Sequence, residues 1–272
     1  MIVSVAIISG VLFLQHYQLN SRNGRSVIEA AEKLILGNDL ASFHRDRWKY
    51  PVGIYVQNSC EIEIFDEVKS YIEEQLEEVY FSFAESASNA QVVFNCDNSE
   101  KILMGFTQSY LDFSLTVFPD EVTNLAHQNR FPVFQFDPRH PAFGVPIFFP
   151  FECNYFLSDP EIFKTCDYSE RTLLYFIFSL NIGSYPSKEK FGIVLEEVSH
   201  AVFLVNDYEV DHPRESIFNT NYMGPMKQWS NSDLQTIKFI VSERMKEVDT
   251  PADLRLALEQ FFGRCQTVDH CS

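Results

Sequence analysis

Two acidic side chains and an imidazole lie close together in one stretch of the chain. Glu196 and His200 are four residues apart, so on a helix they project from the same face, and Glu197 lies beside them. Asp207 follows seven positions after the histidine. Carboxylates and imidazoles bind divalent ions, and a further carboxylate can take a proton from the water that such an ion activates. The spacing therefore predicts a metal site with Glu196, His200 and Asp207 as ligands and Glu197 as general base.

The end of this helix offers more than one third ligand. Asn206 and Asp207 favour turns and would stop the helix at about Val205, and His212 follows shortly afterwards. Two carboxylates with one imidazole make a hard site, which favours Mn²⁺, Fe²⁺ or Ca²⁺ and binds zinc less selectively. In the structural alternative no cofactor is bound: the two glutamates bind backbone groups or neighbouring cations, and the histidine packs in the aromatic core.

The same residues fall on the register of the metzincin zinc-protease motif, H-E-x-x-H-x-x-G-x-x-H. Glu196 replaces the first histidine, Phe203 the glycine and Asn206 the third histidine, whereas Glu197 and His200 are kept. A bulky residue in place of the glycine disfavours the tight turn that brings round a third ligand. The pattern therefore indicates a protease fold more strongly than protease activity.

Further short motifs accompany this one along the chain. They are Arg47-Trp48-x-x-Pro51-Val52, Ala90-Gln91-Val92-Val93-Phe94, Leu204-x-Asn206-Asp207, Ser216-Ile217-Phe218 and Ser232-Asp233. Together with Glu196-Glu197 they resemble an uncharacterised family of exported bacterial proteins, a domain of unknown function with a metzincin-like plan. The resemblance implies a zincin-like mixed sheet with a long amphipathic helix and a motif-bearing helix. In that family the position of His200 is usually Gln and that of Phe203 usually Gly, so this chain departs at both.

The composition excludes several kinds of protein. Hydrophobic residues make up 46% of the 272, with 26 Phe and 12 Tyr, which excludes a disordered chain and allows one large domain or two small ones. The 38 acidic and 21 basic side chains give a formal net charge of −17. Because this charge repels phosphate backbones, we expect no nucleic-acid partner.

Residues 2 to 14 form an almost wholly apolar run. Its length suits a signal peptide and is short for a bilayer span, so we expect export to the bacterial periplasm, envelope or extracellular space. Alternatively, the run is an uncleaved anchor, which would be the protein's only contact with a membrane, or a buried N-terminal element.

Six cysteines form an even set without a C-x-x-C pair. In an exported protein this favours disulfides over a zinc knuckle or a redox motif. Cys153 with Cys166 and Cys265 with Cys271 are the pairs we expect from their proximity in the sequence. The alternative is six reduced thiols in a cytosolic protein.

The patterns of the first hundred residues predict an α/β beginning. Ser26 opens a helix that Gly37 would end, and the residues from Val52 to Val56 are typical of a strand. Apolar residues at helical spacing from Phe65 to Phe83 predict a long amphipathic helix, and Ala90 to Phe94 a second strand. Strand, helix and strand in this order indicate a crossover in a mixed sheet.

The second half is less regular. Five prolines exclude a regular helix from Phe131 to Phe151, which we expect to form irregular or edge strands. The run from Leu173 to Leu180 fits either a helix or a strand. Ser187 is a plausible cap of the motif helix, and later helices begin near Ser232 and at Thr250-Pro251.

These patterns divide the chain into four predicted segments. They are a signal peptide or short anchor (1–20), a linker and N-terminal helix (21–46), a metzincin-like α/β domain (47–245), and a C-terminal helix with a cysteine-containing tail (246–272). We expect a domain without ordinary zinc-protease activity that binds a peptide, an envelope component or a partner protein in the former cleft. The alternative is an active metal-dependent peptidase that uses the four residues at 196, 197, 200 and 207.

Overall fold

The structure of the protein is a computed structural model. It describes residues 22–36, 48–96, 142–149, 172–180, 182–183, 185–207, 216–218 and 228–262. The chain divides into two units, which we call the sheet unit (residues 46–202) and the helical unit (residues 1–45 together with 203–272). The predicted leader and residues 208–215 lie outside the described part. Among the described residues, no helix has the length and apolar character needed to cross a membrane.

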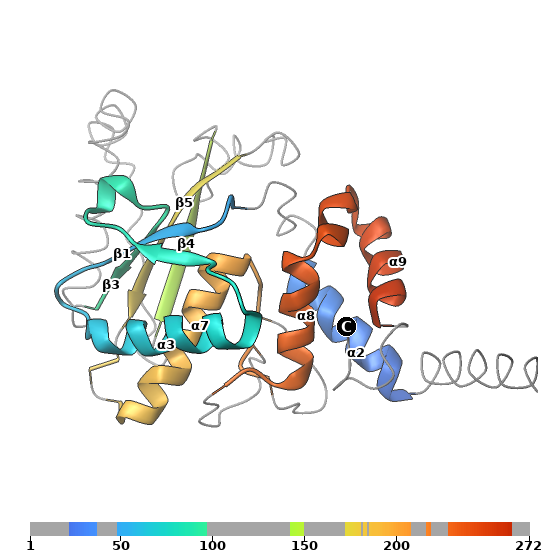
Figure 1. Ribbon diagram of the computed structural model, residues 1–272, viewed down its shortest axis with the longest axis horizontal. Coiled ribbons are helices and arrows are strands. Elements are labelled where there is room, and N and C mark those ends of the chain that lie inside the picture. Colours follow the sequence, from blue (N-terminus) through green and yellow to red (C-terminus); the bar gives the residue numbers. More distant parts are fainter. Residues whose placement is uncertain are drawn as a thin grey trace, which may run out of the picture. The chain divides into compact units, whose positions relative to one another are not determined.

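The sheet unit contains five strands in the order β2-β1-β3-β5-β4. The strands are β1 (Val52–Val56), β2 (Phe81–Phe83), β3 (Val92–Asn95), β4 (Ala142–Phe149) and β5 (Thr172–Leu180). β1 pairs in parallel with β2 and β3, and β3 pairs in parallel with β5. β4 pairs antiparallel with β5 at one end of the order (Figure 1). The predicted mixed α/β class is therefore confirmed.

Helix α3 (Ile62–Leu76) connects β1 to β2 and buries one face, formed by Ile64, Phe65, Val68 and Ile72. The helix is shorter than predicted. Glu77 takes a left-handed conformation with φ 59°, and its N–H donates to the carbonyl of Glu73 at 2.8 Å, which ends the helix.

The sequence prediction extended α3 to Phe83, which was wrong. Val79 has an exposed fraction of 55%, and Phe83 belongs to β2. Because β2 has only three residues, its apolar side chains could be mistaken for a further helical turn.

The predicted edge strand is confirmed as β4, and the ambiguous run that follows forms the strand β5. Pro146 is tolerated within β4 because an edge strand does not need every N–H for the sheet. Gly144 opposes Phe178, and a Cβ at this glycine would lie 2.4 Å from the Phe178 ring. Glycine is therefore required here for the close approach of the two strands.

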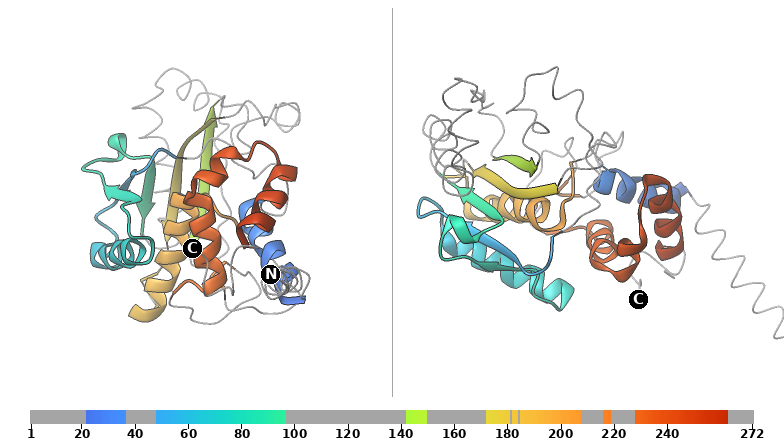
Figure 2. Two further views of the ribbon diagram at one scale, coloured as in Figure 1. Left: turned by 45° about the vertical axis from the view of Figure 1, so that its right-hand side comes forward. Right: turned by 90° about the horizontal axis from the view of Figure 1, so that it is seen from above.

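Helix α7 (Ser187–Phe203) carries the motif and lies with α3 on one side of the sheet (Figure 2). The rings of Tyr71 and Phe191 meet edge to face with centroids 5.9 Å apart, and Lys190 pairs with Glu61. These contacts fix the first half of α7 against α3.

The helical unit packs α2 (Arg22–Leu36) against α8 (Asn231–Val241) and α9 (Pro251–Phe262). Arg255 Nη1 donates to Glu32 Oε2 at 2.7 Å, which ties α9 to α2. The predicted helix end before Gly37 is confirmed, whereas the helix begins at Arg22, earlier than Ser26. α9 begins at Pro251 as predicted.

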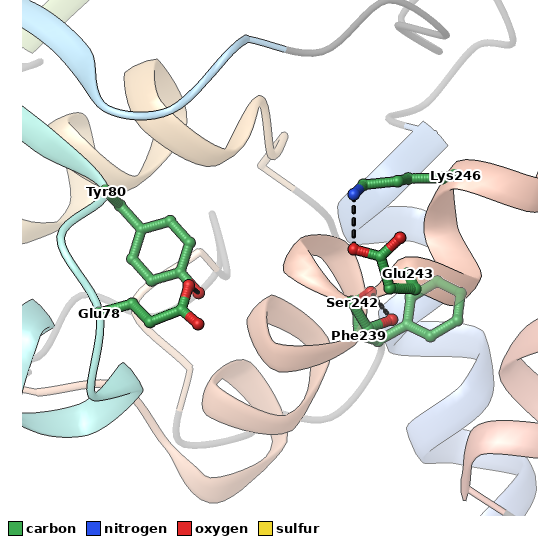
Figure 3. A network of polar contacts seen from close by, with 6 residues as sticks. All are labelled: Glu78, Tyr80, Phe239, Ser242, Glu243 and Lys246. Carbon is green, nitrogen blue, oxygen red and sulfur yellow. Dashed lines mark hydrogen bonds and ion pairs between the residues drawn. The ribbon is translucent and has the colours of Figure 1, made fainter.

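Figure 3 shows polar contacts within each unit. In the helical unit, Ser242 Oγ donates to the carbonyl of Phe239 at 2.6 Å, where α8 ends and the short helix η4 (Glu243–Glu247) begins. Lys246 pairs with Glu243 at 2.5 Å on the exposed side of η4. In the sheet unit, Tyr80 Oη donates to Glu78 Oε2 at 3.1 Å. Burial and this carboxylate both raise the pKa of Tyr80, so it stays protonated at physiological pH.

A buried carboxylate organises the start of α8. Asp233 has an exposed fraction of 2%, and its Oδ1 accepts from Ser216 Oγ at 2.7 Å. Its Oδ2 accepts from the N–H of Ser230 at 3.0 Å, and its own N–H donates to Ser230 Oγ at 3.1 Å, which completes a capping box. The helix cap is thus Ser230, two residues before the predicted start. The Ser-Ile-Phe and Ser-Asp motifs meet in this network.

We expect Asp233→Asn to destabilise the protein by about 1 to 3 kcal/mol, because an amide NH₂ cannot accept from the Ser230 N–H. Burial raises the pKa of Asp233, although bonds from Ser216, Ser230 and Ile217 act against it. The folded protein therefore holds this proton more tightly than the unfolded chain does. The stability that the protonated Asp233 carboxyl contributes is complete below its pKa in the unfolded chain, about 3.9. It is lost as the pH rises through the pKa of Asp233 in the folded protein.

Urea denaturation of both proteins from about pH 4 to about pH 7 tests this prediction. The stability advantage of the wild type should shrink as the pH rises. Asp253→Asn is the matched control, because Asp253 occupies the same position in an exposed capping box with Thr250. An advantage that grows with pH would show that the hydrogen bonds to the carboxylate outweigh its burial.

One disulfide joins Cys60 to Cys96, with an S–S distance of 2.03 Å. This pair was not among those expected from proximity in the sequence. The residues of the two expected pairs, Cys153 with Cys166 and Cys265 with Cys271, lie outside the described residues.

Candidate metal centre

The three predicted ligands come together at the end of α7. Glu196, His200 and Asp207 each offer one ligand atom, and these atoms all lie within 4.8 Å of one another. The glutamate and the histidine are partly buried and the aspartate is exposed. The group belongs to one continuous stretch, the last turns of α7 and the four residues that follow it. A Glu-His-Asp group that could hold a metal ion is therefore present.

The three atoms lie close to the spacing that a single divalent ion requires. Two atoms that bind one ion at about 2.0 to 2.2 Å can lie at most about 4.4 Å apart. The spacing of up to 4.8 Å thus requires only small side-chain movements. His200 lies in the last turn of α7, where the partial negative charge of a helix terminus favours a cation.

The buried face of α7 fixes the direction of the glutamate and the histidine. The residues of this face have exposed fractions of 0%; they are Val194, Leu195, Val198, Ala201 and Val202. Ser199 is buried beside them, and its hydroxyl donates to the carbonyl of Leu195 at 2.6 Å. Glu196 and His200 share the partly exposed side of the helix, together with Glu197. The buried face holds α7 in one rotation about its axis, so the direction of the partly exposed side is fixed as well.

Two aromatic residues that precede β1 secure the end of α7. Trp48 Nε1 donates to the carbonyl of Ala201 at 2.6 Å, and Tyr50 Oη donates to that of Val202 at 3.3 Å. The last carbonyls of a helix have no partners within it, so these bonds stabilise the final turn. Tyr50 also meets the ring of Tyr80 edge to face, with centroids 5.0 Å apart.

The sequence reading gave Trp48 and Tyr50 no part in the site. The motif Arg47-Trp48-x-x-Pro51-Val52 entered only as part of the family resemblance. Trp and Tyr combine a large apolar ring with one polar atom that needs a partner when it is buried. Two of them just before a strand were therefore a signal for anchoring side chains.

The helix stops earlier than predicted. α7 ends at Phe203, and Leu204 takes a left-handed conformation with φ 52°. The prediction placed the stop at Asn206-Asp207. Leu204 and Val205 have exposed fractions of 3% and 5%, so burial of their side chains compensates for a conformation that costs about 1 to 2 kcal/mol in a residue with a Cβ.

The structure distinguishes between Asn206 and Asp207, two of the three candidates for the third ligand. Asn206, at the place of the third histidine in the zinc motif, donates from its side-chain Nδ2 to the carbonyls of Leu34 and Ile35. Asp207, the next residue, joins the group of predicted ligands. His212 lies outside the described residues.

Glu197 and Phe203 complete the motif. Glu197 is partly buried and is not one of the three grouped residues. Phe203 is fully buried, and its ring meets Trp229 edge to face with centroids 5.8 Å apart. The residue in place of the motif glycine is therefore a core residue.

Comparisons of the chain with known protein families, with curated proteins and with solved structures found no match.

Proposed function

We propose that this protein is an exported, metzincin-like hydrolase that uses one divalent metal ion to cleave peptides. The observation that supports the proposal most is the convergence of Glu196, His200 and Asp207. The chemistry and spacing of these residues in the sequence also predict this group.

The order of the elements supports this proposal. The sheet is mixed, a long helix follows β1, and the motif helix α7 follows β5. Export is supported by the apolar run at the start of the chain and by the disulfide, because disulfides persist in oxidising compartments.

The residues of the site divide the chemistry between them. A bound divalent ion would polarise the substrate carbonyl and make water more acidic. Glu196, His200 and Asp207 would hold the ion, and Glu197 would take the proton of the attacking water. Two carboxylates among three ligands favour Mn²⁺, Fe²⁺ or Ca²⁺ over a site specific for zinc.

The peptide specificity rests on the edge strand. Among the described residues β4 pairs only with β5, so its outer edge can offer backbone donors and acceptors to an extended chain. Addition of a strand to a sheet edge is a common way to bind peptides with little dependence on their sequence.

One observation favours a second function, a peptide-binding module that has lost catalysis. Asn206, at the place of the third histidine, is used to bind helix α2. In this alternative the cleft binds peptides or partner proteins, and the acidic group at the end of α7 has no metal.

The metal content of protein purified without chelator tests the proposal. We expect about one equivalent of a divalent metal per chain, and a melting temperature that falls after treatment with EDTA. Glu196→Ala and His200→Ala should each leave less than about a tenth of an equivalent, since even indirect disturbance of a metal site weakens binding by about 10- to 100-fold. The matched control is Glu74→Ala, which removes an exposed carboxylate from α3 and should retain the metal.

The same protein should hydrolyse unstructured peptides and lose this activity with EDTA. A protein that binds no metal, or whose melting temperature ignores both EDTA and added Mn²⁺, would contradict the proposal. In that case peptide binding without cleavage would support the second function.

A further inference from the structure

The disulfide between Cys60 and Cys96 joins the carboxyl ends of two neighbouring strands. β1 and β3 pair in parallel, with Val56 at the end of β1 opposite Phe94 of β3. Cys96 follows β3 directly, and Cys60 lies in the short segment between β1 and α3. The bond therefore lies wholly within the sheet unit.

The bond can be reached from solution in the folded protein. Both cysteines are partly exposed, and Asn58, Ser59 and Glu61 beside Cys60 are exposed. A disulfide breaks when a thiolate attacks one of its sulfurs, so the rate depends on access to the bond. Exposed disulfides are more often labile and regulatory than buried ones.

Hydrogen bonds hold the two ends of the loop together without help from the disulfide. The N–H of Cys96 donates to Ser59 Oγ at 3.1 Å, and Ser59 Oγ donates to Asn95 Oδ1 at 3.2 Å. The N–H of Gln57 donates to the carbonyl of Phe94 at 2.9 Å. The two cysteines therefore stay close to each other when the covalent bond is removed.

The sulfur of Cys60 also has a neighbour that does not depend on the bond. It lies 3.8 Å from the carbonyl oxygen of Phe94, two residues before Cys96. Reduction gives Cys60 an S–H group, which can donate weakly to this oxygen. The thiol is thereby held beside the residue with which it forms the bond.

We propose that Cys60 and Cys96 form a redox switch, which a dithiol reductant opens while the sheet unit stays folded. A thiolate of the reductant attacks one sulfur, forms a mixed disulfide with it and releases the other cysteine as a thiolate. The second thiol of the reductant then attacks the mixed disulfide and releases the first cysteine. Two electrons and two protons pass to the protein, and the reductant becomes a disulfide.

The reverse reaction, with the oxidised form of the reductant, closes the switch. The open form lacks the bond that restricts the unfolded chain, so it is the less stable form of the same fold. The redox state of the surroundings thus sets the stability of the sheet unit. The switch is independent of the proposed function, because it involves neither a metal ion nor a peptide.

Differential alkylation of the full chain tests the proposal. The protein is equilibrated without denaturant in mixtures of reduced and oxidised dithiothreitol, and mass spectrometry of its peptides reports Cys60 and Cys96 separately from the other cysteines. We expect these two to become reduced together and to form the disulfide again when the oxidised reagent is restored. The amides of β1 and β3 should stay protected from hydrogen exchange throughout.

Two results would overturn the proposal at this stage. One is a bond that stays closed until urea unfolds the protein. The other is a loss of protection in β1 and β3 as soon as the bond opens, since the disulfide would then be required for the fold itself.

Ser59→Ala tests whether the hydrogen bonds prepare the open form for closing. It removes two of them, and we expect the equilibrium constant for closing to fall by about 5-fold, the equivalent of one hydrogen bond. Ser70→Ala is the matched control, because Ser70 is an exposed serine whose Oγ donates to the carbonyl of Asp66 in its own helix. It should leave the constant unchanged. A wild-type constant in Ser59→Ala, or an equal fall in both variants, would overturn the proposal.

Discussion

Glu197→Gln is expected to retain bound metal and to lose peptide hydrolysis by about 10²- to 10⁴-fold in kcat, the usual contribution of a general base. The amide has nearly the shape of the carboxylate but cannot take a proton from water. Glu197 is partly buried on the same side of α7 as Glu196 and His200 and is not one of the grouped ligands. The substitution should therefore change kcat and leave KM and metal content close to the wild type.

The comparison with the ligand variants makes this experiment decisive. His200→Ala should lose metal and activity together, whereas Glu197→Gln should lose activity alone. Steady-state kinetics on one unstructured peptide, with metal analysis of the same samples, measures both properties. Loss of metal from Glu197→Gln would assign Glu197 to the coordination sphere, and full activity would remove it from the mechanism.

Local patterns were sufficient to predict much of the sheet unit. β1 and β3 are short, apolar and rich in β-branched residues, and both were found at the predicted places. The prolines between 131 and 151 excluded a helix, and the edge strand β4 lies among them. These features depend on the conformations that each residue type allows, which the sequence states directly.

Helix ends were harder to predict, because tertiary contacts decide them. α3 ends through a left-handed Glu77 and α7 through a left-handed Leu204, although neither residue type favours that conformation. At Leu204 the burial of the side chain outweighs the local cost, and the sequence gives no sign of it. The same limit applies to Cys60 and Cys96, which the pairing of distant strands brings together.

In the candidate metal centre the grouping of Glu196, His200 and Asp207 could be predicted, whereas the hydrogen bonds that hold the backbone around them could not. Glu196 and His200 follow from helical periodicity alone, and Asp207 from its place just after the helix. Trp48, Tyr50 and Asn206 act through backbone carbonyls that lie more than a hundred residues away. Every residue has such a carbonyl, so no pattern of residue types identifies which ones need a donor.

Removal of the disulfide is expected to be the largest single loss of stability. The bond between Cys60 and Cys96 closes a loop with a sequence separation of 36. A loop of this length gives a stabilisation of about 4 kcal/mol, because the bond restricts the unfolded chain. The replacement of both cysteines by serine should lower the free energy of unfolding by about this amount, as measured by urea denaturation under oxidising conditions.

Noncovalent contacts already bring the two ends of this loop together in the folded protein. The N–H of Cys96 donates to Ser59 Oγ at 3.1 Å, and the N–H of Gln57 donates to the carbonyl of Phe94 at 2.9 Å. The folded double variant should therefore keep its structure, so the loss arises in the unfolded state. Ser59→Ala is the matched control, since it removes a contact at the same place without opening the loop and should cost only about 1 kcal/mol. A double variant no less stable than Ser59→Ala would show that the unfolded chain is restricted by other means.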